Sequence, residues 1–190
     1  AGVFSDVSFT VRAGEILGFS GLVGAGRSEI MQAVFGNDPY ESGTVVLAGR
    51  PVRFKNSREA VRAGIAMVPE DRKKQGLTLI NSVGFNITLA NLEIFLSGPF
   101  LSEEKKNRTL GRYMNDLHIK AASKDIAVSS LSRGNQQKAV LSKWLATSPR
   151  VLHLDEPTRG VEVGAKADLY AIIHPLAAEC MAIIMVSSAL

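Results

Sequence analysis

The residues from Gly21 to Ser28 have the types and spacing of a loop that binds phosphate groups. They fit the pattern G-x-x-x-x-G-K-[ST] at every fixed position except one, where Arg27 replaces the lysine. In such a loop the glycines let backbone N–H groups surround an anion, the next helix directs its positive end at it, and the serine hydroxyl ligates Mg²⁺. A tight glycine turn between a strand and a helix is the alternative explanation.

Arg27 keeps the positive charge of the expected lysine but changes its shape. A lysine ammonium is a compact charge that reaches the β- and γ-phosphates of a nucleotide, whereas a guanidinium is wider and planar. We therefore expect nucleotide binding to be preserved and the geometry for hydrolysis to be poorer.

Two adjacent acidic residues, Asp155 and Glu156, follow the apolar segment 151–154. A buried strand that ends there places them at the carboxyl edge of a sheet, where open α/β folds bind ligands. Asp155 is suited to hold Mg²⁺, and Glu156 to polarise the water that attacks a γ-phosphate. The alternative is that the two acids only open a surface loop, and the phosphate loop in the same chain argues against it.

A third polar segment, Ser-Arg-Gly-Asn-Gln-Gln-Lys from Ser132 to Lys138, precedes a predicted helix. Helix capping by Ser132 or Asn135 explains part of it. The segment also supplies hydrogen-bond donors at a helix N-terminus, where a second anion can bind. We expect Gln136 to contact nucleotide there.

The elements that position these residues alternate between strands and helices, which predicts a mostly parallel sheet flanked by helices. Residues 3–12 alternate apolar and polar side chains, as a half-buried strand or hairpin arm does. We expect further strands at 15–20, 43–47, 51–54, 65–68, 151–155 and 182–186. We expect helices at 28–35, 57–64, 103–117, 135–147 and 165–179, with Ser57 as an N-cap and mainly helical patterns over residues 78–129.

The composition of the 190 residues is that of an ordinary globular protein, with 46% hydrophobic and 21% charged residues. The net charge of +4 comes from scattered residues, which argues against a nucleic-acid partner. A single cysteine fits a reducing compartment, and no apolar run is long enough for a membrane helix. The start at Ala1 lacks a signal peptide and an initiator methionine, so we expect a piece of a longer polypeptide.

In this order, the polar segments resemble the motifs of ABC transporter nucleotide-binding domains. The match is closest to the ATPases of ribose, xylose, arabinose and galactose importers, which carry two such domains in tandem. Arg27 and the phrase Val-Pro-Glu-Asp-Arg-Lys at 68–73 resemble the C-terminal domain of the two. The resemblance covers essentially the whole chain, including Asp-Glu-Pro-Thr-Arg-Gly at 155–160 and Gly-Ala-Lys at 164–166.

The resemblance implies an ABC-type P-loop NTPase fold, with an N-terminal antiparallel β portion and a helical subdomain at about 78–130, in one domain of residues 1–190. It implies ATP and Mg²⁺ as cofactors. The implied partners are a second nucleotide-binding domain, transmembrane permease subunits and, indirectly, a periplasmic or extracellular sugar-binding protein. The implied location is peripheral, at the cytoplasmic face of the inner membrane.

By position, the resemblance implies a role for each motif residue. It makes Glu156 the catalytic glutamate, and it places Ser132 and Gly134 in the signature motif that caps the γ-phosphate bound to the opposite domain. The implied metal ligands are Ser28, Glu70 and Asp155. The implied nucleotide contacts in the loop are Gly21, Val23, Gly24, Ala25, Gly26, Arg27, Ser28 and Glu29.

Three departures from the family pattern bear on activity. Arg133 stands where the signature usually has a glycine, Glu162 replaces an aspartate, and residues 186–188 lack the switch histidine. The leading hypothesis is the ATP-binding subunit of a monosaccharide importer. The alternatives are a catalytically degenerate, regulatory half of the same tandem ATPase and a soluble ABC ATPase outside transport.

Overall fold

A computed structural model of the chain describes residues 4–21 and 24–188. A four-stranded parallel sheet forms its centre, in the order β1 (Ile16–Ser20), β8 (Ala182–Ser187), β7 (Val151–Asp155) and β4 (Ile65–Val68). The register pairs Ser20 with Ser187 and Asp155 with Val186, so the ends of β1, β8 and β7 meet at one edge. This edge carries the phosphate loop after β1 and the acidic pair after β7.

Helices and two small hairpins connect these strands. The helical elements are α1 (Arg27–Val34), α2 (Ser57–Arg62), the π-helical turn η1 (Arg72–Gly76), α3 (Val83–Thr88), the 3-10 segment η2 (Leu89–Phe95), α4 (Glu103–Asp116), the 3-10 turn η3 (Val128–Ser130), α5 (Arg133–Leu145) and α6 (Val163–Ala178). The antiparallel hairpins are β2 (Val45–Leu47) with β3 (Arg50–Val52), and β5 (Leu96–Ser97) with β6 (Phe100–Leu101).

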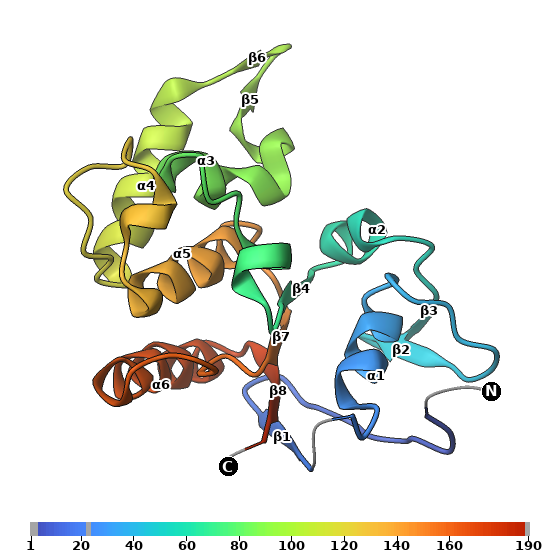
Figure 1. The fold of residues 1–190 in the computed structure, drawn as a ribbon. Helices are drawn as coiled ribbons and strands as arrows, with labels where there is room; N and C mark the ends of the chain where they lie inside the picture. Colours follow the sequence, from blue (N-terminus) through green and yellow to red (C-terminus); the bar gives the residue numbers. More distant parts are fainter. Residues whose placement is uncertain (1–3, 22–23, 189–190) are drawn as a thin grey trace.

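Strands β4, β7 and β8 are buried on both faces, which explains their nearly continuous apolar runs. Ala66 and Val68 of β4 pack into a core with α5 and α6, whereas Ile65 and Met67 pack into a second core with α1. This alternation follows from the two-residue period of a strand. Figure 1 shows α5 and α6 on one side of the sheet and α1 on the other.

Serine caps begin three helices in the segment between β4 and β7. The hydroxyl of Ser82 accepts from the Phe85 N–H at 3.1 Å and begins α3, and Ser102 and Ser132 cap α4 and α5 in the same way. Helical elements dominate this segment, and the short β5–β6 hairpin projects from it (Figure 1).

Several predicted boundaries were wrong. A strand was predicted at 3–12, but residues 4–12 form none, and residue 3 lies outside the described part. The predicted N-terminal antiparallel β portion corresponds instead to the β2–β3 hairpin. The N-cap of α2 is Asn56, whose side chain accepts from the Glu59 N–H, and Ser57 is the first helical residue. Helix α6 begins at Val163, two residues before the predicted start, and ends at Ala178. No helix among the described residues is long and apolar enough to cross a membrane.

Candidate functional site: the edge of the parallel sheet

The loop after β1 turns into α1 through glycines with left-handed backbone angles. Gly24 has φ 85° and Gly26 has φ 82°, a region that residues with a Cβ rarely adopt. Gly26 is the N-cap of α1 and has no side chain, so the first N–H groups of the helix find no side-chain acceptor there. Such uncapped donors suit an anion at the helix N-terminus. The predicted contact Val23 lies outside the described residues.

The first turn of α1 joins the end of β7 through one hydrogen bond. The Ser28 hydroxyl donates to Asp155 Oδ1 at 3.0 Å. Asp155 is 2% exposed, and burial raises the pKa of its carboxyl group, while the Ser28 hydrogen bond acts in the opposite direction. Glu156 and Glu29 also raise this pKa, and Arg27 lowers it. The loop and the acidic pair therefore form one site.

The donor set of this site fits a magnesium ion that is shared with phosphate groups. Mg²⁺ prefers oxygen ligands and is commonly held by one or two carboxylates together with phosphate oxygens. Ser28 and Asp155 supply a hydroxyl and a carboxylate at hydrogen-bond distance, and a cation beside Asp155 offsets the cost of burying its charge. No cluster of three or more His, Cys, Asp or Glu residues that could hold a metal ion exists within residues 4–21 and 24–188.

Arg27 lies at the centre of the same edge. Its side chain is 9% exposed, and its Nη1 donates to the carbonyl oxygen of Ser187 at 2.9 Å. Its Nη2 lies 3.8 Å from Oε1 of Glu156. The guanidinium thus connects the start of α1, the end of β8 and the residue after β7.

Glu156 has an unusual backbone conformation, with φ 44°. Positive φ is uncommon for residues other than glycine and persists where surrounding contacts hold it. Here the Glu156 N–H donates to the Val186 carbonyl at 2.9 Å, and its own carbonyl accepts from the Arg159 N–H at 3.0 Å. These bonds turn the chain sharply after β7.

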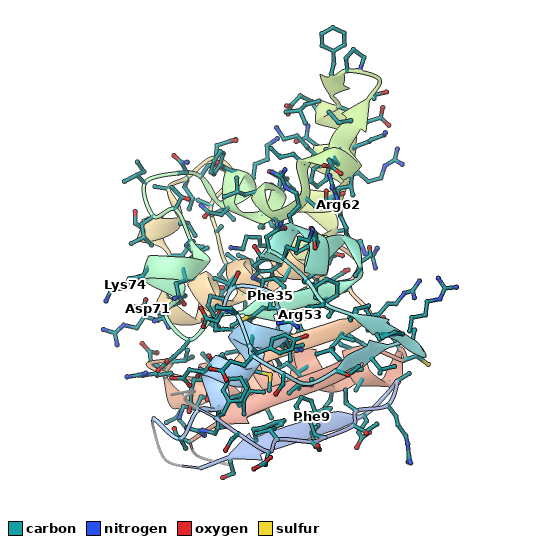
Figure 2. All side chains as sticks on the ribbon, turned by 90° about the vertical axis from the view of Figure 1, so that its right-hand side faces the viewer. Phe9, Phe35, Arg53, Arg62, Asp71 and Lys74 are labelled. Atoms are coloured by element: carbon teal, nitrogen blue, oxygen red, sulfur yellow. The ribbon has the colours of Figure 1, made fainter. Side chains whose placement is uncertain are left out.

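The segment after β4 contacts the loop after β7. Glu70, a predicted metal ligand, forms an ion pair with Arg159. Arg72 is buried, and its Nη1 donates to the Arg159 carbonyl at 3.1 Å. The same residues line a depression of about 320 Å³. In Figure 2, Asp71 and Lys74 of this segment lie at the surface, and Asp71 accepts from the Lys73 and Lys74 N–H groups.

The polar segment from Ser132 to Lys138 forms the N-cap and the start of α5. The Ser132 hydroxyl accepts from the backbone N–H of Asn135 at 3.4 Å, which confirms Ser132 as the cap, and it also accepts from the side-chain amide of Asn135 at 2.9 Å. Gly134 lies against α6, where an added Cβ would be 2.8 Å from the Cβ of Ala165. Gln136 is 6% exposed, and its amide donates to the carbonyls of Val128 and Leu131. Against our expectation of a nucleotide contact, this side chain supports the loop before α5.

The structure thus brings together four predicted residues, Arg27, Ser28, Asp155 and Glu156, at one edge. Glu29 lies close enough to affect the Asp155 carboxyl, and Gly21, Gly24 and Ala25 are exposed in the loop. Sequence reasoning missed the contact of Arg27 with Ser187 and the pairing of Glu70 with Arg159. The available signal was sequence position: Ser187 lies in the segment 186–188 that lacks the switch histidine, and Arg159 lies three residues after Glu156.

Comparison with known proteins identifies the family. The family model described as "ABC transporter" matches residues 4–159. The ribose import ATP-binding protein RbsA of Geobacillus kaustophilus is 53% identical over 189 residues, which are 100% of this chain and 38% of that protein. The xylose import ATP-binding protein XylG of Paraburkholderia xenovorans is 52% identical over 98% of this chain and 36% of that protein.

Solved structures support the same fold. The dimeric structure of MJ0796, a bacterial ABC transporter cassette, has a TM-score of 0.81 at 18% identity and covers 98% of this chain and 80% of that one. A nucleotide-free ATP-binding cassette from an ABC transporter has a TM-score of 0.84 at 19% identity, over 99% of this chain and 76% of that one. The family match and the fold agree, and this chain belongs to the ABC transporter family.

Proposed function

We propose that this chain is a nucleotide-binding domain of an importer that couples ATP binding and hydrolysis to the uptake of a monosaccharide. The observation that carries the proposal is the hydrogen bond between Ser28 and Asp155, because it joins a phosphate-loop helix to a buried carboxylate at the sheet edge. The relatives named for ribose and xylose import support the sugar class.

In the proposed reaction, water attacks the γ-phosphorus of ATP and the bond from that phosphorus to the β–γ bridging oxygen breaks, giving ADP and phosphate. Glu156 accepts a proton from the attacking water. Ser28 and Asp155 would hold Mg²⁺, which when bound neutralises charge on the phosphate oxygens. The backbone N–H groups from Gly21 to Ser28 bind the phosphates.

The proposed assembly contains a second nucleotide-binding domain. The chain spans 38% and 36% of the lengths of the two named relatives, which supports a tandem arrangement within a longer polypeptide. In that arrangement Ser132 and Gly134 face the γ-phosphate held by the opposite domain, and Glu70 exchanges Arg159 for the metal. Membrane permease subunits and a sugar-binding protein complete the importer, with this chain at the cytoplasmic face of the membrane.

A second candidate is a regulatory half-site that binds nucleotide and hydrolyses it slowly. The contact of Arg27 with Glu156 favours it, because the residue in the lysine position of the phosphate loop is engaged by the proposed general base. Both candidates require nucleotide binding at the same edge and differ only in turnover.

Uptake of radiolabelled ribose or xylose, measured in vesicles that contain the protein with its membrane subunits, tests the proposal. Asp155→Asn should reduce uptake at least about 10²-fold, because one charge-stabilising group is typically worth that much. Glu41→Gln, at an exposed acidic residue, is the matched control. An unchanged uptake rate in Glu156→Gln would favour the regulatory half-site. An unchanged uptake rate in Asp155→Asn would refute both candidates.

A further inference from the structure

Two acceptors for Arg27 lie among the described residues, and both are fixed by the sheet. Ser187, whose carbonyl accepts from Nη1, pairs with Ser20 at the end of β8. Glu156, which lies 3.8 Å from Nη2, is tied to β8 through its N–H bond to Val186. The planar fork of a guanidinium can reach both acceptors at once, whereas a lysine ammonium concentrates its donors at one point.

The Glu156 carboxylate is almost enclosed at this position. Its side chain is 11% exposed, and Oε1 accepts no hydrogen bond from the residues that the structure describes. A buried carboxylate oxygen without a hydrogen bond is costly unless a cation lies near it. Arg27 supplies that cation, so each side chain stabilises the position of the other.

We propose that Arg27 is a positioning residue that clamps Glu156 and thereby slows hydrolysis at this half-site, with or without bound nucleotide. The inference rests on the proposed nucleotide-binding function and names the physical cause of low turnover. A general base accelerates its reaction about 10²- to 10⁴-fold only when a carboxylate oxygen can accept the proton of the attacking water. The clamp holds Oε1 of Glu156 toward Arg27 and so fixes the orientation of the whole carboxylate, which hinders its other oxygen from turning toward the attacking water.

Arg27→Lys tests the clamp directly, because lysine keeps the charge and gives up the fork. In the protein with its membrane subunits, and with turnover at the other half-site blocked by a substitution there, we expect kcat for ATP to rise at least about tenfold, a small part of the general-base effect. KM should change less than about threefold. Adding Glu156→Gln should abolish the gain. Arg58→Lys, at an exposed position of α2, is the control and should leave both constants unchanged.

A double-mutant cycle of Arg27→Met and Glu156→Gln supplies a readout other than activity. The unfolding equilibrium constant, measured by urea denaturation, should show a coupling of about fivefold or more between the two sites, both without nucleotide and at saturating ATP. Loss of the coupling at saturating ATP, or a kcat in Arg27→Lys that is unchanged or lower, would overturn the clamp. Failure of the unsubstituted protein to bind ATP would instead refute the proposed function.

Discussion

Replacing Gly134 by alanine tests how closely α5 packs on α6. The added Cβ would lie 2.8 Å from the Cβ of Ala165, whereas two carbon atoms prefer about 3.5–4.0 Å, so one helix must move by about 1 Å. Overpacking of this kind costs about 1–3 kcal/mol. Alanine is favoured over glycine within a helix by at most about 1 kcal/mol. We expect a net destabilisation of about 1 kcal/mol and a Tm lower by about 2–4 °C.

Gly111 in α4 is the matched control, because an added Cβ there meets no atom within 4 Å. Because alanine has a higher helix propensity than glycine, Gly111→Ala should raise the free energy of unfolding by up to about 1 kcal/mol. The double variant Gly134→Ala with Ala165→Gly should recover the steric part of the loss. Thermal and urea unfolding followed by circular dichroism measure all three. A Gly134→Ala protein as stabilised as Gly111→Ala would refute the packing argument.

The buried imidazole of His153 predicts acid sensitivity, because burial lowers its pKa to about 4 from about 6.5 in the unfolded chain. The unfolded state takes up the proton first, so this contribution to stability is present above pH 6.5 and is lost as the pH falls toward 4. The free energy of unfolding, measured in urea, should fall by about 2 kcal/mol between pH 7 and pH 5, and His153→Leu should remove this fall. An equal fall in both proteins would contradict this. Asn86→Ala should cost about 2–3 kcal/mol in urea unfolding, because Asn86 is fully buried and its side chain bonds Thr78 in both directions; a cost below about 0.5 kcal/mol would contradict this. Arg62→Gln should change the free energy of unfolding by less than about 1 kcal/mol, because both side chains of its ion pair with Glu93 are exposed. A larger loss in urea unfolding would contradict this.

Three strands of the sheet were predictable because their burial leaves a direct trace in the sequence. Strands β4, β7 and β8 are mainly apolar and buried on both faces, and the predicted ranges agree with them to within a residue. Apolar and polar side chains alternate over residues 4–12 as in a strand, yet no strand forms there. A strand also needs a neighbouring strand for its backbone hydrogen bonds, and the alternation of side chains does not show whether one is present. The β5–β6 hairpin has strands of two residues each, too short to produce a pattern.

The site was predictable where topology alone brings residues together. Parallel strands end at one edge, so a helix that starts after β1 and an acid that ends β7 lie near each other, as Ser28 and Asp155 do. The contact of Arg27 with Glu156 depends on side-chain rotamers and on a carbonyl of β8, which spacing does not specify. Likewise, no local pattern shows that Gln136 turns inward.

The central claim is that the sheet edge binds nucleotide through the loop and magnesium through Ser28 and Asp155. Isothermal titration of ATP into the protein, with and without Mg²⁺, measures it most directly. We expect Mg²⁺ to tighten ATP binding at least about tenfold, and Asp155→Asn to remove that gain while leaving magnesium-free binding within about threefold. ATP binding that is absent at millimolar concentration, or that gains equally from Mg²⁺ in Asp155→Asn, would contradict the account.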